Sequence, residues 1–314
     1  MPIFRIHHVT KYEYDRPVKE SMNSIMIYPF QSVSQETLQH ELLITGNPDV
    51  FTFTDYWGNR AGTFNLLPLH RELMIESKLV IRTLGDTTES FPKTLPADLS
   101  HAIGDDLQLT ELSRVSFVKA LDTMKAFVDA LFDPDKTVAQ LVKDTCSFIF
   151  HHFTYIKGIT NIETTVDEIL EKKAGVCQDF AHVMLEVLRM MGIPARYVSG
   201  YICPNKNGMR GEGATHAWVE AFIPGHGWAG SDPTNNVWAT NHHVKLAVGR
   251  DFSDCSPVKG TFKGPARQAL SVYVSVGYED GETFEELNRV QLEKQSGTEV
   301  PEIIIDTFAG QQQQ

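Results

Sequence analysis

The first 85 residues show the alternation of apolar and polar side chains that is typical of β-strands. Residues 3–14, IFRIHHVTKYEY, follow a period of two imperfectly, and further runs lie between turn residues at 46–48 and 58–59. These runs are LQHELLIT, VFTFTDYW, GTFNLL and LMIESKLVIRT. Short strands at this spacing predict a small β-sandwich or meander. Because this region has no nucleophile-and-base arrangement, we expect it to be a structural or substrate-presenting module.

The pattern changes to a helical one in the middle of the chain. Residues 91–112 contain three helix breakers, Pro92, Pro96 and Gly104, and we interpret them as a link between two parts. Residues 116–132 and 137–153 then place apolar side chains three and four positions apart, which predicts two helices. Cys146 lies on the apolar stripe of the second helix, where a buried structural cysteine is expected.

A helix over about residues 177–191 is the most informative element of the second half. Gly175 breaks the chain before it, and Gly192 and Pro194 end it in the expected order. Its apolar stripe runs through Phe180, Val183, Met184, Val187, Leu188 and Met191. Cys177 precedes Phe180 by three positions, so the thiol lies at the helix N-terminus and faces the domain. Strands are predicted at 195–202, 216–223, 227–232 and 269–278.

The position of Cys177 suits a nucleophile. Unpaired N–H groups and the positive end of the helix dipole favour the thiolate, which is the reactive form. The same N–H groups can bind the oxyanion that forms when a thiolate attacks a carbonyl. A cysteine that merely packs at this position is the alternative.

A base and a carboxylate follow on two strands. The strand HAWVEAFI begins at His216, the turn PGHG reverses the chain, and the strand GWAGSD ends at Asp232, where Pro233 stops it. Antiparallel pairing can bring the two side chains together, so the carboxylate would hold the imidazole in one tautomer. The imidazole could then take the proton of Cys177 and return one to a leaving amine. A packed or surface histidine is the alternative.

These segments together resemble a known family. GVCQDFAH, GIPARYVSGY, THAWVEAF and GWAGSDPTN occur in the order found in the transglutaminase-like superfamily, especially its bacterial cysteine peptidase branch. The patches YEYDRPV and DYWGN resemble the bacterial transglutaminase-like N-terminal domain. The resemblance implies an α+β fold. It further implies a papain-like core, with the cysteine helix packed on an antiparallel sheet, after a β-rich N-terminal domain. It also implies acyl transfer through a thioester to water or an amine.

The expected organisation is a β-rich domain at 1–100, a helical pair with the catalytic core at 101–285, and a polar tail at 286–314. The expected catalytic triad is Cys177, His216 and Asp232. Animal transglutaminases use an upstream tryptophan at the oxyanion, and this chain has none between positions 57 and 218. Tyr155 is the candidate replacement, with a core tyrosine as the alternative.

Three further features surround the expected triad. Gln178 and Asp179 either orient the site or cap the helix. The glycine-rich loop at 203–215 either borders a cleft or is an ordinary surface loop.

Hydrolysis of an amide or peptide bond is the favoured reaction, because water is always available. The alternatives are protein-glutamine cross-linking and a non-catalytic scaffold or peptide-binding module. An arylamine N-acetyltransferase-like enzyme is disfavoured, since no basic cluster suits the phosphates of an acyl-CoA. The expected partner is a peptide or protein substrate.

Composition excludes other classes. Lys and Arg number 28 against 40 Asp and Glu, a net charge of −12, which disfavours nucleic acid and anionic membranes. No apolar run approaches the length of about 18 residues that a membrane-spanning helix needs, and the N-terminus lacks a signal-peptide pattern. The four cysteines form no CxxC pair. We therefore expect a cytoplasmic protein with reduced thiols. Adjacent histidines do not chelate together and HExxH is absent, so we expect no metal or other cofactor.

Overall fold

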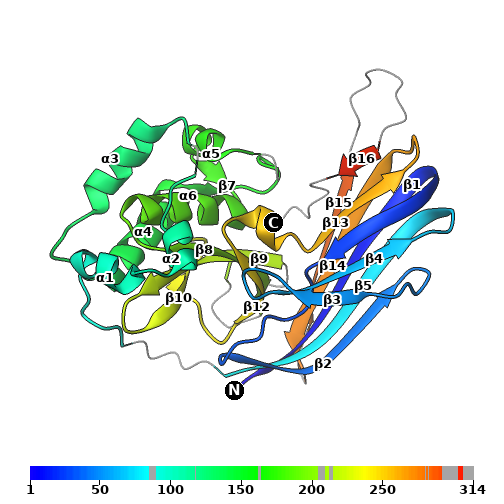
Figure 1. The fold of residues 1–314 in the computed structure, drawn as a ribbon, viewed down its shortest axis with the longest axis horizontal. Coiled ribbons are helices and arrows are strands. Elements are labelled where there is room, and N and C mark those ends of the chain that lie inside the picture. The colour runs from blue at the N-terminus through cyan, green and yellow to red at the C-terminus, as the bar shows by residue number, and fades with distance from the viewer. Residues whose placement is uncertain are drawn as a thin grey trace.

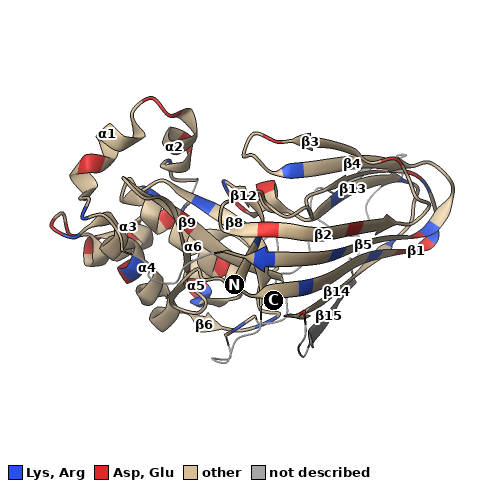
Figure 2. Ribbon diagram, turned by 90° about the horizontal axis from the view of Figure 1, so that it is seen from below, with Lys and Arg blue, Asp and Glu red and all other residues tan. Residues whose placement is uncertain are grey.

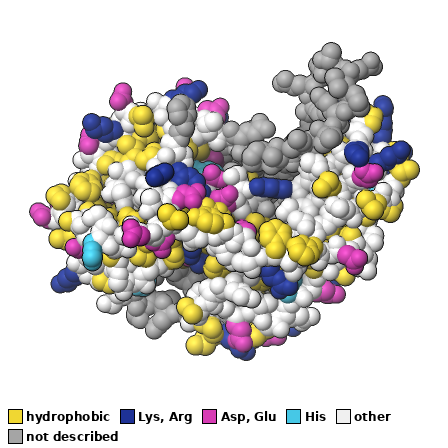
Figure 3. Space-filling view, in the orientation of Figure 1, with side chains coloured by type: hydrophobic (Ala, Val, Ile, Leu, Met, Phe, Trp, Pro, Cys, Tyr) yellow, Lys and Arg dark blue, Asp and Glu magenta, His cyan; other side chains and the backbone are white. Residues whose placement is uncertain are grey.

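The computed structural model describes residues 1–84, 90–116, 118–161, 164–203, 209–211, 215–279, 281, 283–291 and 303–306. It shows a large curled antiparallel sheet beside a smaller sheet that is covered by helices (Figure 1). Charged residues of both signs are spread along the ribbon of both parts (Figure 2). They are also interspersed on the face drawn in Figure 3.

The large sheet is built around one long strand, β1 (Ile3–Ile25). Its first half pairs with β5 (His70–Thr83) and β14 (Gln268–Tyr278), and its second half with β4 (Arg60–Leu66) and β13 (Val258–Lys263). The outer strands are β2 (Gln35–Ile44), β3 (Phe51–Thr54), β15 (Thr283–Gln291) and β16 (Ile303–Asp306).

The predicted alternation of apolar and polar residues along β1 matches the structure, in which one face of the strand is buried. Phe4, Ile6, Tyr12 and Tyr14 point into the core of the curled sheet, while the residues between them are exposed or partly exposed, apart from His8 and Thr10. The strand bends near Glu20, where φ is +46° and the register with β13 shifts. This bend lets one strand serve both halves of the sheet.

Helices occupy the middle of the chain. The two predicted longer helices are confirmed as α3 (Leu121–Leu131) and α4 (Val138–His152), while Phe117 lies outside the described residues. The segment 91–112 holds three short helical elements, which differs from the plain link that its breakers indicate. These elements are η1 (Pro96–Asp98), α1 (Leu99–Ile103) and α2 (Leu107–Leu112). Pro96 begins the first of them and Gly104 follows the second, because proline is tolerated in a first helical turn and glycine at a helix end.

The smaller sheet has the strand order β11-β10-β9-β8-β12. Its strands are β8 (Ala195–Ile202), β9 (Thr215–Ile223), β10 (Gly227–Asp232), β11 (Val237–Trp238) and β12 (His243–Gly249). Helix α6 (Cys177–Met190) packs on β8 and β9. Ala217, Val219 and Ala221 of β9 face a fully buried core that they share with α6. The expected papain-like arrangement, a cysteine helix on an antiparallel sheet, is therefore confirmed.

Both ends of the chain contribute to the large sheet. Strands β13 and β14 come after the smaller sheet in sequence, yet they pair with β1 at the start of the chain. Strands β15 and β16 then pair with β14 and β13 within residues that the sequence assigns partly to a tail. An alternating pattern predicts a strand but not its partner, so sequence alone does not place these strands. Among the helices that the structure describes, none has the length and apolar character needed to cross a bilayer.

Candidate active site

Helix α6 begins at Cys177, and the residues around it explain why. The Asp179 carboxylate accepts a hydrogen bond from the Val176 backbone N–H at 2.7 Å and another from the Thr160 hydroxyl at 2.5 Å. Asp179 thereby caps the helix, which is one of the two roles that the sequence left open. A Cβ on Gly175 would lie 2.4 Å from the Asp179 Oδ2 atom, so only glycine leaves room for this cap. Burial raises the pKa of Asp179.

Cys177 is fully buried in the core beneath the sheet, and Gln178 beside it is also buried. The thiol occupies the first turn of α6, where the backbone N–H groups lack helical partners. A short parallel pair, β6 (Thr154–Tyr155) and β7 (Ala174–Gly175), runs beside this helix start. These elements give the sulfur a rigid and electropositive setting.

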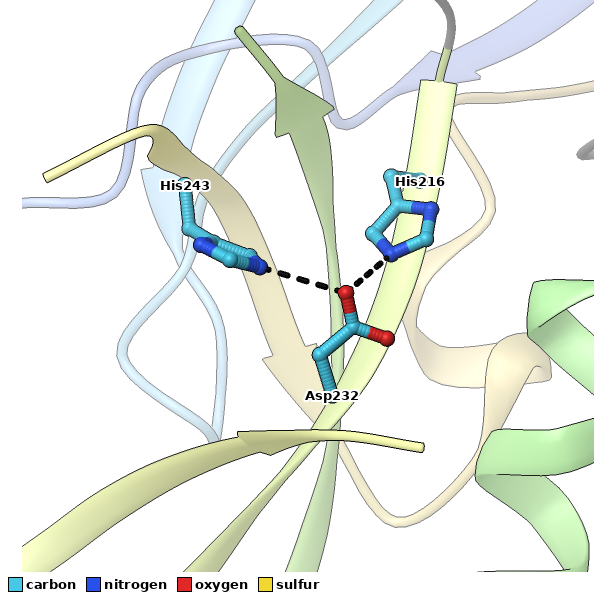
Figure 4. Close-up of side chains that lie close together, drawn as sticks. All are labelled: His216, Asp232 and His243. Atoms are coloured by element: carbon cyan, nitrogen blue, oxygen red, sulfur yellow. Dashed lines mark hydrogen bonds and ion pairs between the residues drawn. The ribbon is translucent and has the colours of Figure 1, made fainter. Parts of the chain in front are cut away.

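His216 and Asp232 meet across the smaller sheet, as the hairpin predicts. Strands β9 and β10 pair antiparallel, and His216 Nε2 lies 2.9 Å from Asp232 Oδ2 (Figure 4). Because a carboxylate can only accept, Nε2 carries the proton and donates it, which leaves the Nδ1 lone pair of neutral His216 available. Nδ1 is fully buried and has no hydrogen-bond partner in the described part of the chain.

The charges at this site reinforce one another. Burial alone would lower the pKa of His216, but the Asp232 carboxylate and then the Cys177 sulfur outweigh it and raise that pKa to about 10. Burial opposes ionisation of Asp232, yet the charge and hydrogen bond of His216 hold the pKa of this carboxyl well below its usual range. The Cys177 sulfur is close enough to contribute to this raised pKa, so the two side chains are neighbours. This raised pKa favours the imidazolium form of His216 at neutral pH.

Asp232 receives more donors than the expected triad provides. Its Oδ2 atom also accepts from Asn235 Nδ2 at 2.8 Å and lies 3.3 Å from His243 Nε2, and Oδ1 accepts from the Thr234 N–H at 2.9 Å. Sequence reasoning missed Asn235 and His243 as site residues. The segment GWAGSDPTN contains Asn235, whereas His243 belongs to the adjacent pair His242–His243, and adjacent histidines were set aside as metal ligands.

His216, Asp232 and His243 also form a cluster of possible metal ligands, with ligand atoms within 4.8 Å of one another. Their hydrogen bonds do not suit a metal. The Thr240 N–H donates to His243 Nδ1 at 3.0 Å, so the proton of neutral His243 sits on Nε2, the atom that faces Asp232. His216 presents a protonated Nε2 to the same carboxylate. Both imidazoles therefore offer N–H donors there, where a metal would need lone pairs.

Tyr155, the candidate oxyanion donor, lies beside the start of α6. Its strand residue pairs with Gly175, two positions before Cys177, and its ring stands edge-on to Phe180 with centroids 6.2 Å apart. The structure thus places Tyr155 beside the first turn of α6, while its role at an oxyanion stays a prediction.

The glycine-rich loop reaches the site at Arg210, although positions 204–208 and 212–214 lie outside the described residues. The Arg210 N–H donates to Asn235 Oδ1 at 2.7 Å, and the guanidinium lies 4.7 Å over the Phe150 ring. Asn235 joins this loop to Asp232, so the described part of the loop borders the site, one of its two expected roles.

Cys146 is buried, as expected, and its sulfur donates to the Asp232 backbone carbonyl at 3.3 Å. Burial raises the pKa of this thiol to about 12, so Cys146 stays neutral. It packs beneath the site, and a thiol that stays neutral is a poor nucleophile.

Comparison with known proteins adds the family. The model of the bacterial transglutaminase-like N-terminal region matches residues 4–82, and that of the transglutaminase-like superfamily matches residues 125–233, which include Cys177, His216 and Asp232. An uncharacterized protein of Mycobacterium leprae is 30% identical over 282 residues, covering 87% of this chain and 97% of its own. The chain belongs to the transglutaminase-like superfamily.

Two further comparisons involve this transglutaminase-like protein. A crystal structure from Cytophaga hutchinsonii, which bears the name "Putative Cysteine Protease", has a TM-score of 0.68 and 21% identity, with 96% of each chain covered. It supports the same fold along nearly the whole chain. A protein-glutamine gamma-glutamyltransferase of Pseudomonas aeruginosa is 37% identical over 90 residues, covering 27% of this chain and 14% of its own.

Proposed function

We propose that this transglutaminase-like protein is a cysteine-dependent acyl-transfer enzyme that hydrolyses amide or peptide bonds. The observation that carries the proposal is the buried His216 imidazole, whose Nε2–H is bound by Asp232, whose Nδ1 has no hydrogen-bond partner among the described residues, and which has Cys177 as a neighbour. A nucleophile, a base and an orienting carboxylate in this order define a catalytic triad.

The chemistry follows from these positions. The Cys177 thiolate attacks the substrate carbonyl carbon, and the carbonyl oxygen takes up the negative charge. The N–H groups at the start of α6, with the Tyr155 hydroxyl beside them, are the candidate donors to this oxyanion. The C–N bond then breaks as His216 Nδ1 gives its proton to the leaving amine. A thioester remains on the sulfur.

The second half of the reaction decides the product. Water attacks the thioester, His216 takes its proton, and the acid and the free thiolate are released. A primary amine at the same position would give a new amide instead, which is the cross-linking alternative. The local similarity to the Pseudomonas aeruginosa transferase keeps that alternative open, and the name of the Cytophaga hutchinsonii protein agrees with hydrolysis. A non-catalytic scaffold would not need the intact triad.

The test compares Cys177→Ala with Cys203→Ala, which removes another buried thiol whose side chain packs in the large-sheet core. The wild type and Cys203→Ala should hydrolyse members of a peptide library, and mass spectrometry should find the acyl group and iodoacetamide on Cys177. Cys177→Ala should lose at least about 1000-fold in rate, because the nucleophile of a triad cannot be replaced by water alone.

Hydrolysis that persists in Cys177→Ala would remove the nucleophile assignment. A fluorescent primary amine added to the same reactions separates the two products. Amine incorporation that outpaces hydrolysis would favour cross-linking, and the absence of both reactions would favour the scaffold.

A further inference from the structure

His243 lies outside the matched superfamily core, which ends at residue 233, yet it approaches Asp232 from the side opposite to His216 (Figure 4). Its Nε2 atom is 3.3 Å from Asp232 Oδ2, and its side chain is almost fully buried. Trp218 stands edge-on to its ring, with centroids 5.1 Å apart, and stacks on His216 at 6.3 Å. One indole therefore packs against both imidazoles.

The tautomer of His243 is fixed by its other nitrogen. Nδ1 accepts the Thr240 backbone N–H at 3.0 Å, and a backbone amide can only donate. Nε2 must therefore carry the proton of the neutral ring and donate it to Asp232. Burial lowers the pKa of His243 below its ordinary value despite the nearby carboxylate, so the ring is a neutral donor at pH 7. Nothing in this arrangement requires His243 to exchange a proton during a reaction.

The strand that carries His243 is held in place by the N-terminal region. Strand β12 is an edge of the smaller sheet, and two amide side chains occupy the side that β8 leaves open. Gln35 donates to the Lys245 carbonyl at 2.8 Å and accepts from its N–H at 2.9 Å. Asn59 makes the same pair of bonds to Val248 at 2.7 and 2.8 Å. The edge strand thus gains fixed partners where it would otherwise meet water.

The anchoring extends to the segment before the strand. The Thr83 hydroxyl donates to the Asn241 carbonyl at 2.8 Å, two residues before His243. Asn59 is itself held by Asp55, whose carboxylate accepts from the Asn59 amide at 2.8 Å. The DYWGN segment therefore positions β12 through side chains.

We propose that His243 is a positioning residue, held by the N-terminal region, that fixes the Asp232 carboxylate from the side opposite to His216. A carboxylate bound from one side can rotate about its side-chain bonds, whereas donors on both sides hold Oδ2 where it aligns His216 toward Cys177. His243 touches neither substrate nor sulfur in this role. The inference rests on the proposed function, because it concerns the orientation of that triad.

The experiment compares His243→Phe, which keeps an aromatic ring and removes both nitrogens, with His243→Gln, which restores an N–H donor near the position of Nε2. His242→Gln serves as the control, since it removes the adjacent imidazole and keeps the hydrogen bonds of Asp232 unchanged. Each full-length variant is measured for kcat, KM, stability in urea and the rate of iodoacetamide alkylation at Cys177.

We expect His243→Phe to lower kcat about 10- to 100-fold with KM nearly unchanged, as loss of an orienting partner does elsewhere. His243→Gln should recover most of kcat, because its amide N–H can donate to Asp232. It should remain about as unstable as His243→Phe, because one glutamine side chain cannot donate to Asp232 and also accept the Thr240 N–H. If His243 had a purely structural role, kcat would instead fall equally in His243→Phe and His243→Gln. Wild-type kcat in His243→Phe, or equal kcat losses in both variants, would overturn the proposal.

A second measurement needs neither substrate nor a stable variant. Long-range ¹H–¹⁵N spectra of the histidine-labelled wild type should show His243 as a neutral ring protonated at Nε2 at pH 7. A ring protonated at Nδ1 would overturn the positioning role, even if Cys177→Ala proves the nucleophile assignment. Conversely, activity in Cys177→Ala would defeat the proposed function while leaving this spectrum as expected.

Discussion

Glu220 offers a quantitative test of how the smaller sheet is held together. From β9 its carboxylate pairs with Arg196 on the adjacent β8, at 2.7 Å, and with Lys245 on β12, the strand beyond β8. All three side chains are largely buried, at 12%, 7% and 11% exposed for Arg196, Glu220 and Lys245. The ion pairs therefore cross three strands, and one of them carries His243.

The magnitude follows from the pKa of Glu220. Burial opposes its ionisation, but Lys245 and Arg196 outweigh burial and lower the pKa from 4.5 to about 2. At about 1.4 kcal/mol per pKa unit, the gap of about 2.5 units corresponds to about 3 kcal/mol. Because the folded-state pKa is the lower one, this contribution is present above pH 4.5 and is lost as the pH falls toward 2. About half of it should be gone by pH 3.

The perturbation is Glu220→Gln, and the assay is urea unfolding at pH 7, 5, 4 and 3. We expect the variant to be about 3 kcal/mol less stable at pH 7, since it leaves two buried cations without their anion. The difference from the wild type should shrink as the pH falls, because the wild-type carboxylate is then neutralised. Glu36→Gln is the matched control, as it breaks the exposed pair with Arg82 and should cost less than about 1 kcal/mol. A difference that stays constant from pH 7 to pH 3 would refute the reasoning.

Two further predictions concern the supports of the site. Gly175→Ala should displace the Asp179 cap, because the added Cβ would overlap the Asp179 carboxylate. We expect the variant to be less stable by about 1–3 kcal/mol in urea unfolding and its Cys177 to be alkylated more slowly. Unchanged alkylation would show that the cap does not position the thiol. Asn59→Leu should cost about 2 kcal/mol or more, since both Val248 backbone groups lose a partner, and should lower kcat together with stability. Full kcat in a folded Asn59→Leu protein would show that His243 does not depend on this anchor.

The sequence predicts the helix and the hairpin of the site well because both are local. The stripe from Phe180 to Met191 fixes the face of α6, and the turn at 224–227 fixes which ends of β9 and β10 meet. That register leaves Asp232, one residue beyond the Ser231–Val219 pair, diagonal to His216, so the hairpin brings the two side chains within reach of each other. Asp179 is also predictable as a helix cap from its position near Cys177.

The rest of the site depends on contacts between distant segments. His243 follows the irregular residues 239–242, and only the pairing of β12 with β8 brings it to Asp232. The bonds of Gln35 and Asn59 to β12 join positions about 200 residues apart and leave no periodic pattern. The sequence did not predict the short helices before α3 for a different reason. Pro96 and Gly104 were interpreted as loop residues, but proline and glycine also occur at the ends of helices.

The central place of β1 has a consequence for synthesis. Residues 4–14 are synthesised well before the strand that flanks them on one side, because β14 follows them by more than 250 residues in the sequence. Until then one edge of β1 can pair only with a transient neighbour or another chain. Termination after residue 233 but before Gln268 would therefore release a product with an unpaired edge on β1, even though every residue of the matched superfamily core had already been made.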